Sequence, residues 1–401
     1  AAILVTSMLF MGIGCKEAAT AEAEETTEEA APVEEETTEE AEETAEPETK
    51  QPVTLQIMAN QDWVQKSFMQ KSWEAYEEAT GNTLELIVVP IDSGEEFMLT
   101  KFATGDIPDI FMHFGGLGLA PYDPEKNFVD FSDAEWVDDI MPYVISQTMY
   151  GGKLYGLPFW EASVSGTLYN KEIFADLGID IPTTQTEFEA ACETIKNAGI
   201  TPIYMAFKDV WPLSYMYCLD SMVADEEVLS KLNSNEITYA DIPEFADMLA
   251  WYKKMADNGY LGEFFTTNTW DGCAEGIGSG EYAMIYVWDS WVWEDLEPVY
   301  PGMSESIGMM PAFLGTPEEG NYEGPAICNT YANKNSDNVD AAIEFINFMA
   351  TSENINMAFD GVECAPVFKS QTSNVPTAQF VEASDVIDAI SNPPIAWMDI
   401  I

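Results

Sequence analysis

Short apolar runs alternate with amphipathic helical segments from residue 53 onward, and this order limits the possible folds more than any other feature. Residues 53–57 alternate as in a half-buried strand, whereas Phe68, Met69, Trp73 and Tyr76 follow helical spacing. A β-α-β-α-β order predicts a parallel or mixed sheet flanked by helices. The pattern predicts three strands and two helices in this opening region: strands 53–57, 84–89 and 109–112, and helices 68–76 and 95–104.

Two later segments also carry helix signals. Thr184 and Glu187 have the spacing of a capping box and open an apolar-faced helix that ends at Gly199. Apolar residues recur with helical spacing over 339–349. The chain has 401 residues, which is enough for two domains that each have a core.

The basic residues are few and of one kind. The formal charge is -56, all 15 basic residues are lysines, and His113 is the one histidine. Arginine is the usual partner of carboxylates and phosphates, so a site for anionic ligands is disfavoured. Nucleic-acid binding needs a basic face, which this composition does not supply. A single histidine also excludes a multi-histidine zinc site, and we expect no metal and no cofactor.

The six cysteines show no C-x-x-C spacing, so zinc ribbons and thioredoxin-like chemistry are not indicated. Cys15 stands apart near the start of the chain. For the other five, buried free thiols are the favoured interpretation, and one disulfide remains an alternative that the sequence alone does not pair.

The first fifty residues have a different character from the rest. Residues 1–14 are apolar but too few to span a bilayer, which is typical of the hydrophobic part of a secretory signal. Gly12-Ile13-Gly14-Cys15 resembles a bacterial lipobox, so we interpret 1–15 as a signal remnant and Cys15 as the lipidated residue. Residues 16–50 contain 15 Glu and two Lys, and we expect 16–51 to form an acidic, disordered tether.

Tryptophan and acidic residues cluster in the loops that follow predicted strands. Ligands of open α/β sheets bind beyond the carboxyl ends of the strands, so these loops are candidate binding segments. Four of the five contain tryptophan: Asn60–Trp63, His113–Gly116, Trp160–Glu161, Phe207–Trp211 and Trp288–Trp291.

Five sequence blocks occur in order along the folded part of the chain: KFATGDIPDI at 101–110, GKLYGLP at 152–158, LYNKEIF at 168–174, GEYAM at 280–284 with Ser290-Trp291, and AAIEF at 341–345. Together they resemble the family 1 extracellular solute-binding proteins of carbohydrate ABC transporters, which are of the maltose-binding-protein kind. Tyr282 and Asp289 depart from the family's pattern in the fourth block.

The resemblance implies an α/β fold of the type II periplasmic-binding-protein kind. Two lobes, each a central sheet flanked by helices, would be joined by three hinge crossings. We expect the crossings near 160–163, near 324–328 and after Phe368. The solute-binding domain would cover 52–401, and we expect its second lobe to lack the terminal helices that the family usually carries. The expected bounds are about 52–161 and 327–369 for lobe I, and about 162–326 and 370–401 for lobe II.

The same resemblance and the chemistry of sugars nominate the ligand-binding residues. A tryptophan face covers the apolar face of a sugar ring, and carboxylates accept hydrogen bonds from its hydroxyls. Trp291 matches the family's stacking tryptophan and Glu161 its hinge glutamate, and an extended segment would place Trp291 and Trp293 on one face. Core packing is the alternative for each tryptophan. The predicted ligand-binding residues are Asp62, Trp63, His113, Trp160, Glu161, Asp209, Trp211, Trp288, Asp289, Trp291 and Glu363.

The sequence thus predicts a lipid-anchored, monomeric binding protein on the extracellular face of a bacterial cell membrane. It would deliver a sugar or oligosaccharide to the permease subunits of an ABC importer and would not be an enzyme. Two other hypotheses stay open. A secreted glycoside hydrolase would need a pair of carboxylates across a glycosidic bond. A binder of a cationic solute such as a polyamine would also use acids and aromatic rings.

Overall fold

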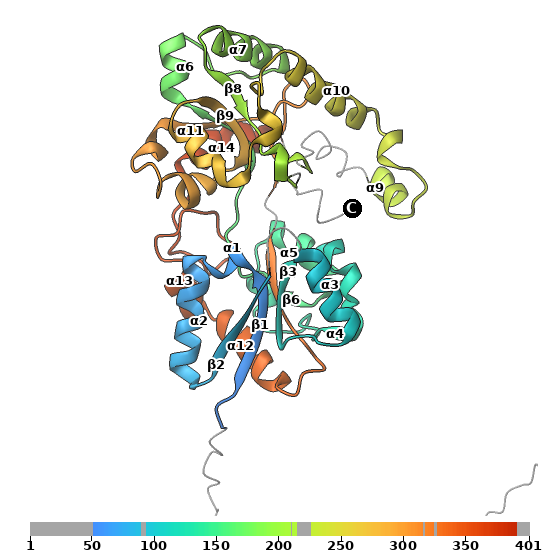
Figure 1. The fold of residues 1–401 in the computed structure, drawn as a ribbon. Coiled ribbons are helices and arrows are strands. Elements are labelled where there is room, and N and C mark those ends of the chain that lie inside the picture. The colour runs from blue at the N-terminus through green and yellow to red at the C-terminus, as the bar shows by residue number, and fades with distance from the viewer. Residues whose placement is uncertain are drawn as a thin grey trace, which may run out of the picture. The chain divides into compact units, whose positions relative to one another are not determined.

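Two β-sheets organise the chain, as the computed structural model shows (Figure 1). The structure describes residues 51–89, 94–209, 211–214, 226–315, 317–324 and 327–390. The predictions for the signal segment, Cys15, the tether and the last eleven residues therefore lie outside the described residues. We call the part built on the first sheet lobe I and the part built on the second sheet lobe II.

The lobe I sheet is mixed, with the strand order β2-β1-β3-β11-β6. β1 runs parallel to β2 and β3, and β11 runs antiparallel to β3 and β6. The three strands predicted at the start of the domain are confirmed within a few residues. The strands are β1 (Thr54–Asn60), β2 (Thr83–Val89), β3 (Ile110–Phe114), β6 (Gly156–Leu157) and β11 (Cys328–Ala332).

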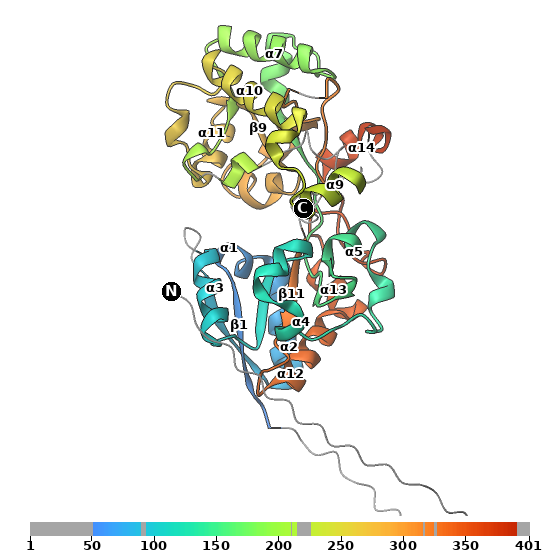
Figure 2. The same ribbon diagram turned by 90° about the vertical axis from the view of Figure 1, so that its right-hand side faces the viewer.

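Helices cover both faces of this sheet because its strands send alternate apolar side chains to opposite sides. Leu55 and Ile57 of β1 pack with α2, α12 and α13, whereas Met58 packs with α3 and the segment that follows β3 (Figures 1 and 2). The predicted helix over 339–349 is confirmed as α12. These helices are α2 (Ser67–Thr80), α3 (Gly94–Thr104), α12 (Val339–Met349) and α13 (Ser352–Ala358).

The lobe II sheet has the order β10-β7-β9-β8. β8 and β9 are parallel, and β7 pairs antiparallel with both β9 and β10. Met284 and Tyr286 of β9 face α7 and α10, while Ile285 and Val287 face α11 and α14. The strands are β7 (Ser165–Asn170), β8 (Thr201–Tyr204), β9 (Tyr282–Trp288) and β10 (Ile307–Met310). The helices are α7 (Gln185–Asn197), α10 (Pro243–Asp257), α11 (Cys273–Gly278) and α14 (Ala378–Ile390).

The start of α7 confirms the predicted N-cap. The Thr184 side chain accepts a hydrogen bond from the backbone N–H of Glu187 at 3.2 Å. The Glu187 carboxylate accepts from the backbone and hydroxyl of Thr183, one residue earlier than a capping box predicts. The backbone N–H groups of Thr183 and Glu187, at the amino-terminal end of α7, are both hydrogen-bonded in this way.

Shorter elements complete both lobes. They include a two-stranded hairpin of β4 (Met149–Tyr150) and β5 (Lys153–Leu154). The helices are α1 (Gln61–Val64), α4 (Pro124–Asn127), α5 (Pro142–Thr148), α6 (Lys171–Leu177) and α9 (Glu226–Asn233). The remaining helical turns are η2 (Gly116–Tyr122), η3 (Val137–Asp139), η4 (Phe207–Asp209), η5 (Trp211–Ser214), η7 (Tyr239–Asp241), η8 (Phe265–Thr267), η9 (Trp270–Gly272), η10 (Val292–Leu296) and η11 (Met303–Ser306).

The chain passes between the lobes three times: between β6 and β7, between β10 and β11, and between α13 and α14. Two bridges join the crossing segments, since Ala162 pairs with Ala365 and Ser165 pairs with Glu323. Such pairing keeps the backbone groups of the crossings hydrogen-bonded without making either sheet continuous with the other.

Three structural findings bear on the classes of function considered above. Cys192, Cys273, Cys328 and Cys364 are free and buried, which agrees with the favoured interpretation of these thiols. In the described part of the chain, no His, Cys, Asp and Glu side chains gather as a metal site requires. None of the described helices has the length and apolar character needed to cross a membrane.

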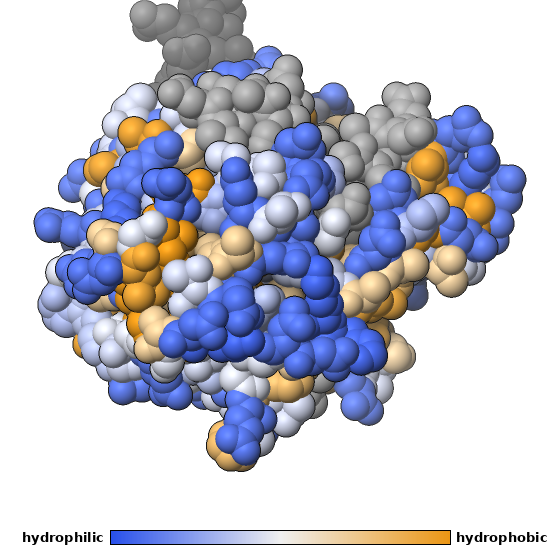
Figure 3. Space-filling model, turned by 90° about the horizontal axis from the view of Figure 1, so that it is seen from above, coloured by the Kyte–Doolittle hydropathy of each residue, from blue (hydrophilic) through white to orange (hydrophobic). Residues whose placement is uncertain are grey.

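Hydrophilic residues dominate the face in Figure 3, where hydrophobic residues lie in separate areas.

Candidate functional site

The first candidate segment follows the carboxyl end of β1. The chain turns there into α1, a single turn that contains Asp62 and Trp63. Backbone N–H groups of Gln65 and Lys66 donate to the carbonyls of Asp62 and Trp63, which closes this turn before α2 begins. The tight turn therefore holds Asp62, Trp63 and Lys66 close behind the carboxyl end of β1.

Lys66 joins three parts of the molecule. Its ammonium lies 3.2 Å from a carboxylate oxygen of Glu161, in the crossing between β6 and β7, and also pairs with Glu294 in η10 of lobe II. The same Nζ atom lies 5.8 Å from the centroid of the Trp160 ring, within the range of a cation–π contact. Burial lowers the pKa of Lys66, but Glu161 and Glu294 outweigh this effect and raise it, so the side chain is an ammonium ion at neutral pH.

Carboxylates surround this lysine. Burial first, and the charge of Glu294 second, raise the pKa of Glu161, against the opposing effect of Lys66. The pKa of Asp295 is raised to about 6, by burial first and then by the charges of Glu294 and Asp62, against the opposing effect of Lys66. Asp62 has a raised pKa because the protein removes part of its water and because Asp271 of lobe II repels it. We call Asp62, Glu161, Asp271, Glu294 and Asp295 the interlobe acidic cluster.

Three tryptophans form a continuous row beside the carboxyl ends of β8 and β9 in lobe II. The Trp270 ring stacks on Trp288 with a centroid distance of 5.3 Å and contacts Trp211 at 4.7 Å. Asp209 accepts a hydrogen bond from the backbone N–H of Trp270 and fixes the start of η9. Trp211 is 39% exposed, and the other two rings are partly exposed. We call Trp211, Trp270 and Trp288 the aromatic row.

Lobe I contributes aromatic rings of its own. Trp63 is partly exposed and makes edge contacts with Phe114 at 5.2 Å and Trp160 at 5.5 Å. Trp160 is only 7% exposed and also packs against Phe68. Trp160 therefore supports Trp63 and Lys66 from the core side, whereas Trp63 and the aromatic row keep surface that a ligand can touch.

The structure brings most of the predicted residues into one region. Asp62, Trp63, Trp160 and Glu161 surround Lys66, and Asp209, Trp211 and Trp288 belong to the aromatic row or support it. The electrostatic repulsion between Asp62 and Asp271 links the two groups, because Asp271 follows Trp270 in η9.

Sequence reasoning missed Lys66, Trp270, Asp271, Glu294 and Asp295. The dipeptide Trp270-Asp271 repeats the tryptophan-plus-carboxylate pattern of the predicted loops, so this signal was present in the sequence. Lys66 had no such signal, because nothing in a list of 15 lysines marks the one that meets two buried carboxylates.

Two predicted ligand contacts are wrong. Trp291 is 0% exposed and packs in the lobe II core, and Asp289 is 1% exposed. The segment after Trp291 is helical rather than extended, so Trp291 and Trp293 do not share a face. Asp289 instead accepts hydrogen bonds from the backbone of Val164 at 2.6 Å and from the Thr377 hydroxyl at 2.5 Å, which ties together two of the crossings.

His113 and Glu363 lie outside the group around Lys66. His113 is 9% exposed, contacts Glu95 at 3.3 Å and packs on Phe111 and Tyr122. This side of β3 is opposite to Phe114, which touches Trp63. Glu363 is partly buried, its pKa is raised by burial, and its backbone pairs with Val375. Both residues remain predictions that no contact in the described residues supports.

The Asp289→Asn substitution separates a structural role from a ligand-binding role. The amide keeps the size of the side chain but loses one acceptor, so we expect a loss of about 1–2 kcal/mol in the free energy of unfolding near about pH 5, below the raised pKa of about 6 of Asp289. Ligand affinity should stay within about twofold of the wild type, because Asp289 is buried away from solvent. Urea denaturation and calorimetric titration measure the two quantities, and a large affinity loss at unchanged stability would contradict this assignment.

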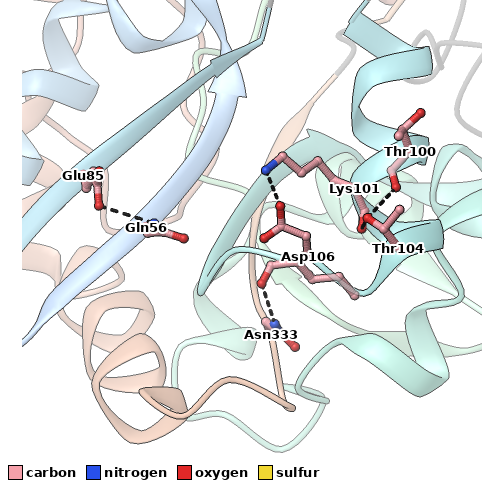
Figure 4. A network of polar contacts seen from close by, with 8 residues as sticks. Gln56, Glu85, Thr100, Lys101, Thr104, Asp106 and Asn333 are labelled. Carbon is pink, nitrogen blue, oxygen red and sulfur yellow. Dashed lines mark hydrogen bonds and ion pairs between the residues drawn. The ribbon is translucent and has the colours of Figure 1, made fainter.

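A depression of about 480 Å³ lies away from these residues, at the amino-terminal ends of the lobe I strands. Its polar groups bind one another: Asp109 accepts from the backbone of Gln56 at 2.8 Å, and Gln56 donates to Glu85 at 3.3 Å. Asn333 likewise donates to the Ile107 carbonyl at 3.3 Å, and just outside the depression Lys101 pairs with Asp106 (Figure 4). Groups that already satisfy one another do not call for a ligand, so we place the functional site at the opposite ends of these strands.

Comparison with known proteins identifies the class of molecule. Residues 61–355 match the bacterial extracellular solute-binding protein family, and the chain belongs to this family. A solved chitin oligosaccharide binding protein has a TM-score of 0.74 at 22% identity, covering 87% of this chain and 90% of that one. The predicted two-lobe type II fold with its three crossings is thereby confirmed.

Curated relatives match over shorter stretches. An uncharacterised ABC transporter extracellular-binding protein of Pyrococcus horikoshii is 26% identical over 192 residues, which are 46% of this chain and 43% of the relative. The melibiose/raffinose/stachyose-binding protein of Bacillus subtilis is 32% identical over 124 residues, which are 30% of this chain and 28% of the relative. The chain thus aligns with less than half the length of each of these relatives.

Proposed function

We propose that this protein is the substrate-binding component of an ABC importer and that it binds a sugar or short oligosaccharide between its lobes. The aromatic row is the observation that carries the proposal, because three contacting tryptophan rings end beside carboxylates from both lobes. Related proteins that bind melibiose, raffinose and stachyose, or chitin oligosaccharides, support the same ligand class.

The chemistry of the site suits a sugar. A pyranose ring has an apolar C–H face, which a tryptophan face desolvates, and a rim of hydroxyls, which carboxylates accept from. Trp211, Trp270 and Trp288 offer several adjoining faces, which favours a ligand of more than one ring. Asp62 of lobe I and Asp271 of lobe II are exposed and can accept hydrogen bonds from the sugar hydroxyls.

Transport requires that binding change the relation of the lobes. A ligand that touches Trp63 of lobe I and the aromatic row of lobe II favours the arrangement in which both contacts form. The three crossings permit such a motion, and the permease subunits would recognise the closed arrangement. We further propose that Cys15 carries a lipid anchor that holds the protein, as a monomer, at the extracellular face of the membrane.

A binding screen tests this function. Thermal-shift measurements with malto-, cello-, xylo-, chito- and raffinose-series oligosaccharides should raise the melting temperature for at least one series, because a ligand that binds only the folded state stabilises it. Calorimetric titration of that ligand should show saturable binding. Chromatography after long incubation should recover the oligosaccharide intact, and hydrolysis products would favour a glycoside hydrolase instead.

A further inference from the structure

The interlobe acidic cluster has more negative charge than the protein compensates. It contains five carboxylates, and Lys66 is the one cation that the described residues place in contact with any of them. Lys66 pairs with Glu161 and Glu294, which leaves Asp62, Asp271 and Asp295 without a contacting ammonium. When all five carboxylates are ionised, four negative charges remain uncompensated.

The protonation behaviour of the cluster agrees with this imbalance. The pKa values of Asp62, Glu161 and Asp295 are all raised, with burial as the largest cause and neighbouring carboxylates as a further cause. Excess negative charge is costly in a partly buried place, and a bound cation relieves this cost.

A second observation indicates what kind of group is missing. Glu161 is 4% exposed, and its Oε2 atom accepts no hydrogen bond from another residue in the described part of the chain. A buried carboxylate oxygen is normally satisfied, so this atom calls for a donor from a ligand or water. The nearby aromatic surface suits a cation as well as a sugar, since Lys66 itself sits 5.8 Å from the Trp160 ring centroid.

We propose that the ligand is a saccharide that carries an amino group, whose ammonium binds the interlobe acidic cluster beside Lys66. This inference rests on the proposed saccharide-binding function and narrows its ligand class. The sugar rings occupy the tryptophan faces, and the ammonium donates to the carboxylates that Lys66 leaves uncompensated. Saccharides that carry carboxylates or phosphates are excluded, because they would add negative charge to the same place.

Matched pairs of ligands test the inference. Cello-oligosaccharides and chitosan oligosaccharides of equal length differ only by a hydroxyl or an ammonium on each ring, and galactose and galactosamine oligomers form a second pair. Calorimetric titration at a pH that keeps the amines protonated should show the amino member binding at least about tenfold more tightly. Oligogalacturonates, which carry carboxylates, should bind most weakly.

Two variants connect the preference to the cluster. Glu294→Gln and Asp295→Asn each remove one negative charge, so each should reduce the preference for the amino member to about threefold or less. Glu281→Gln removes the same charge from an exposed residue directly before β9, at the strand end far from Trp288, and should keep the full preference. The pair of variants guards against a single substitution that fails to fold.

The outcomes distinguish the inference from the function on which it rests. Equal or tighter binding of the neutral members, or tight binding of oligogalacturonates, would overturn the amino-saccharide inference and leave saccharide binding intact. Binding of no saccharide in any arm would overturn both. Spermidine serves as a further probe, and its binding without any saccharide binding would assign the cluster to a polyamine instead.

Discussion

Saccharide binding is expected to weaken about 30-fold in the Trp270→Ala variant, which corresponds to about 2 kcal/mol. Trp270 is the middle ring of the aromatic row, so its loss removes a stacking face and also the support of both neighbouring rings. Its backbone N–H is held by Asp209, and this contact does not depend on the side chain. The substitution therefore removes the ring while keeping the anchor of η9.

Phe264→Ala is the matched control for this prediction. Phe264 is an aromatic residue six positions earlier and is 69% exposed, but it belongs to neither the aromatic row nor the interlobe acidic cluster. Calorimetric titration should give it an affinity close to that of the wild type. Melting temperatures of both variants show whether an affinity change follows from lost stability. An unchanged affinity in Trp270→Ala would place the sugar elsewhere in the molecule.

The order of strands and helices could be predicted from the sequence because each element follows from local periodicity. Alternation over 53–57 and helical spacing over 339–349 became β1 and α12 with small shifts at their ends. Strand ends also nominated the candidate binding residues, since ligands of open sheets meet the carboxyl ends of strands. Asp62, Trp63, Trp211 and Trp288 were predicted in this way.

The errors came where one conformational choice changed the direction of a side chain. A helical turn after β9, in place of an extended segment, turns Trp291 into the core and leaves Trp270 and Trp288 to form the row. No periodicity in a short Trp-rich segment distinguishes these alternatives. Lys66 was missed for another reason: its importance depends on Glu161 and Glu294, which are far from it in the sequence.

The interlobe acidic cluster could not be recognised in the sequence because the whole chain is acidic. With 71 acidic residues, an acidic loop carries little information, and only the structure shows which carboxylates share a low-dielectric environment. The raised pKa values separate Glu161 and Asp295 from the many solvated carboxylates on the surface. The same criterion identifies Glu323, a buried glutamate that the proposed binding function does not use.

Glu323 is expected to make the protein less stable as the pH rises. It is 2% exposed, its Oε1 atom has no hydrogen-bond partner among the described residues, and burial raises its pKa from 4.5 to about 8. The folded state therefore binds the proton more tightly than the unfolded state. Its stabilising contribution is complete below the unfolded pKa of 4.5 and is lost as the pH rises toward and through about 8.

The Glu323→Gln variant removes this dependence, because glutamine has the same shape and does not titrate. Wild type and variant should have similar unfolding free energies near about pH 5, and the variant should be more stable by roughly 3 kcal/mol near about pH 8. Urea denaturation across this pH range measures both curves. Glu161, Asp289 and Asp295 also have raised pKa values and keep part of the pH dependence in both proteins, so the contribution of Glu323 is read from the difference between the two curves.

The control for this comparison is Glu281→Gln, which removes the same charge from the exposed residue directly before β9. General relief of repulsion in a chain of charge -56 would stabilise both variants equally. Local burial predicts instead that only Glu323→Gln flattens the curve. Because Glu323 pairs with Ser165 in a crossing between the lobes, equal slopes in wild type and Glu323→Gln would mean that this crossing admits water to the carboxylate.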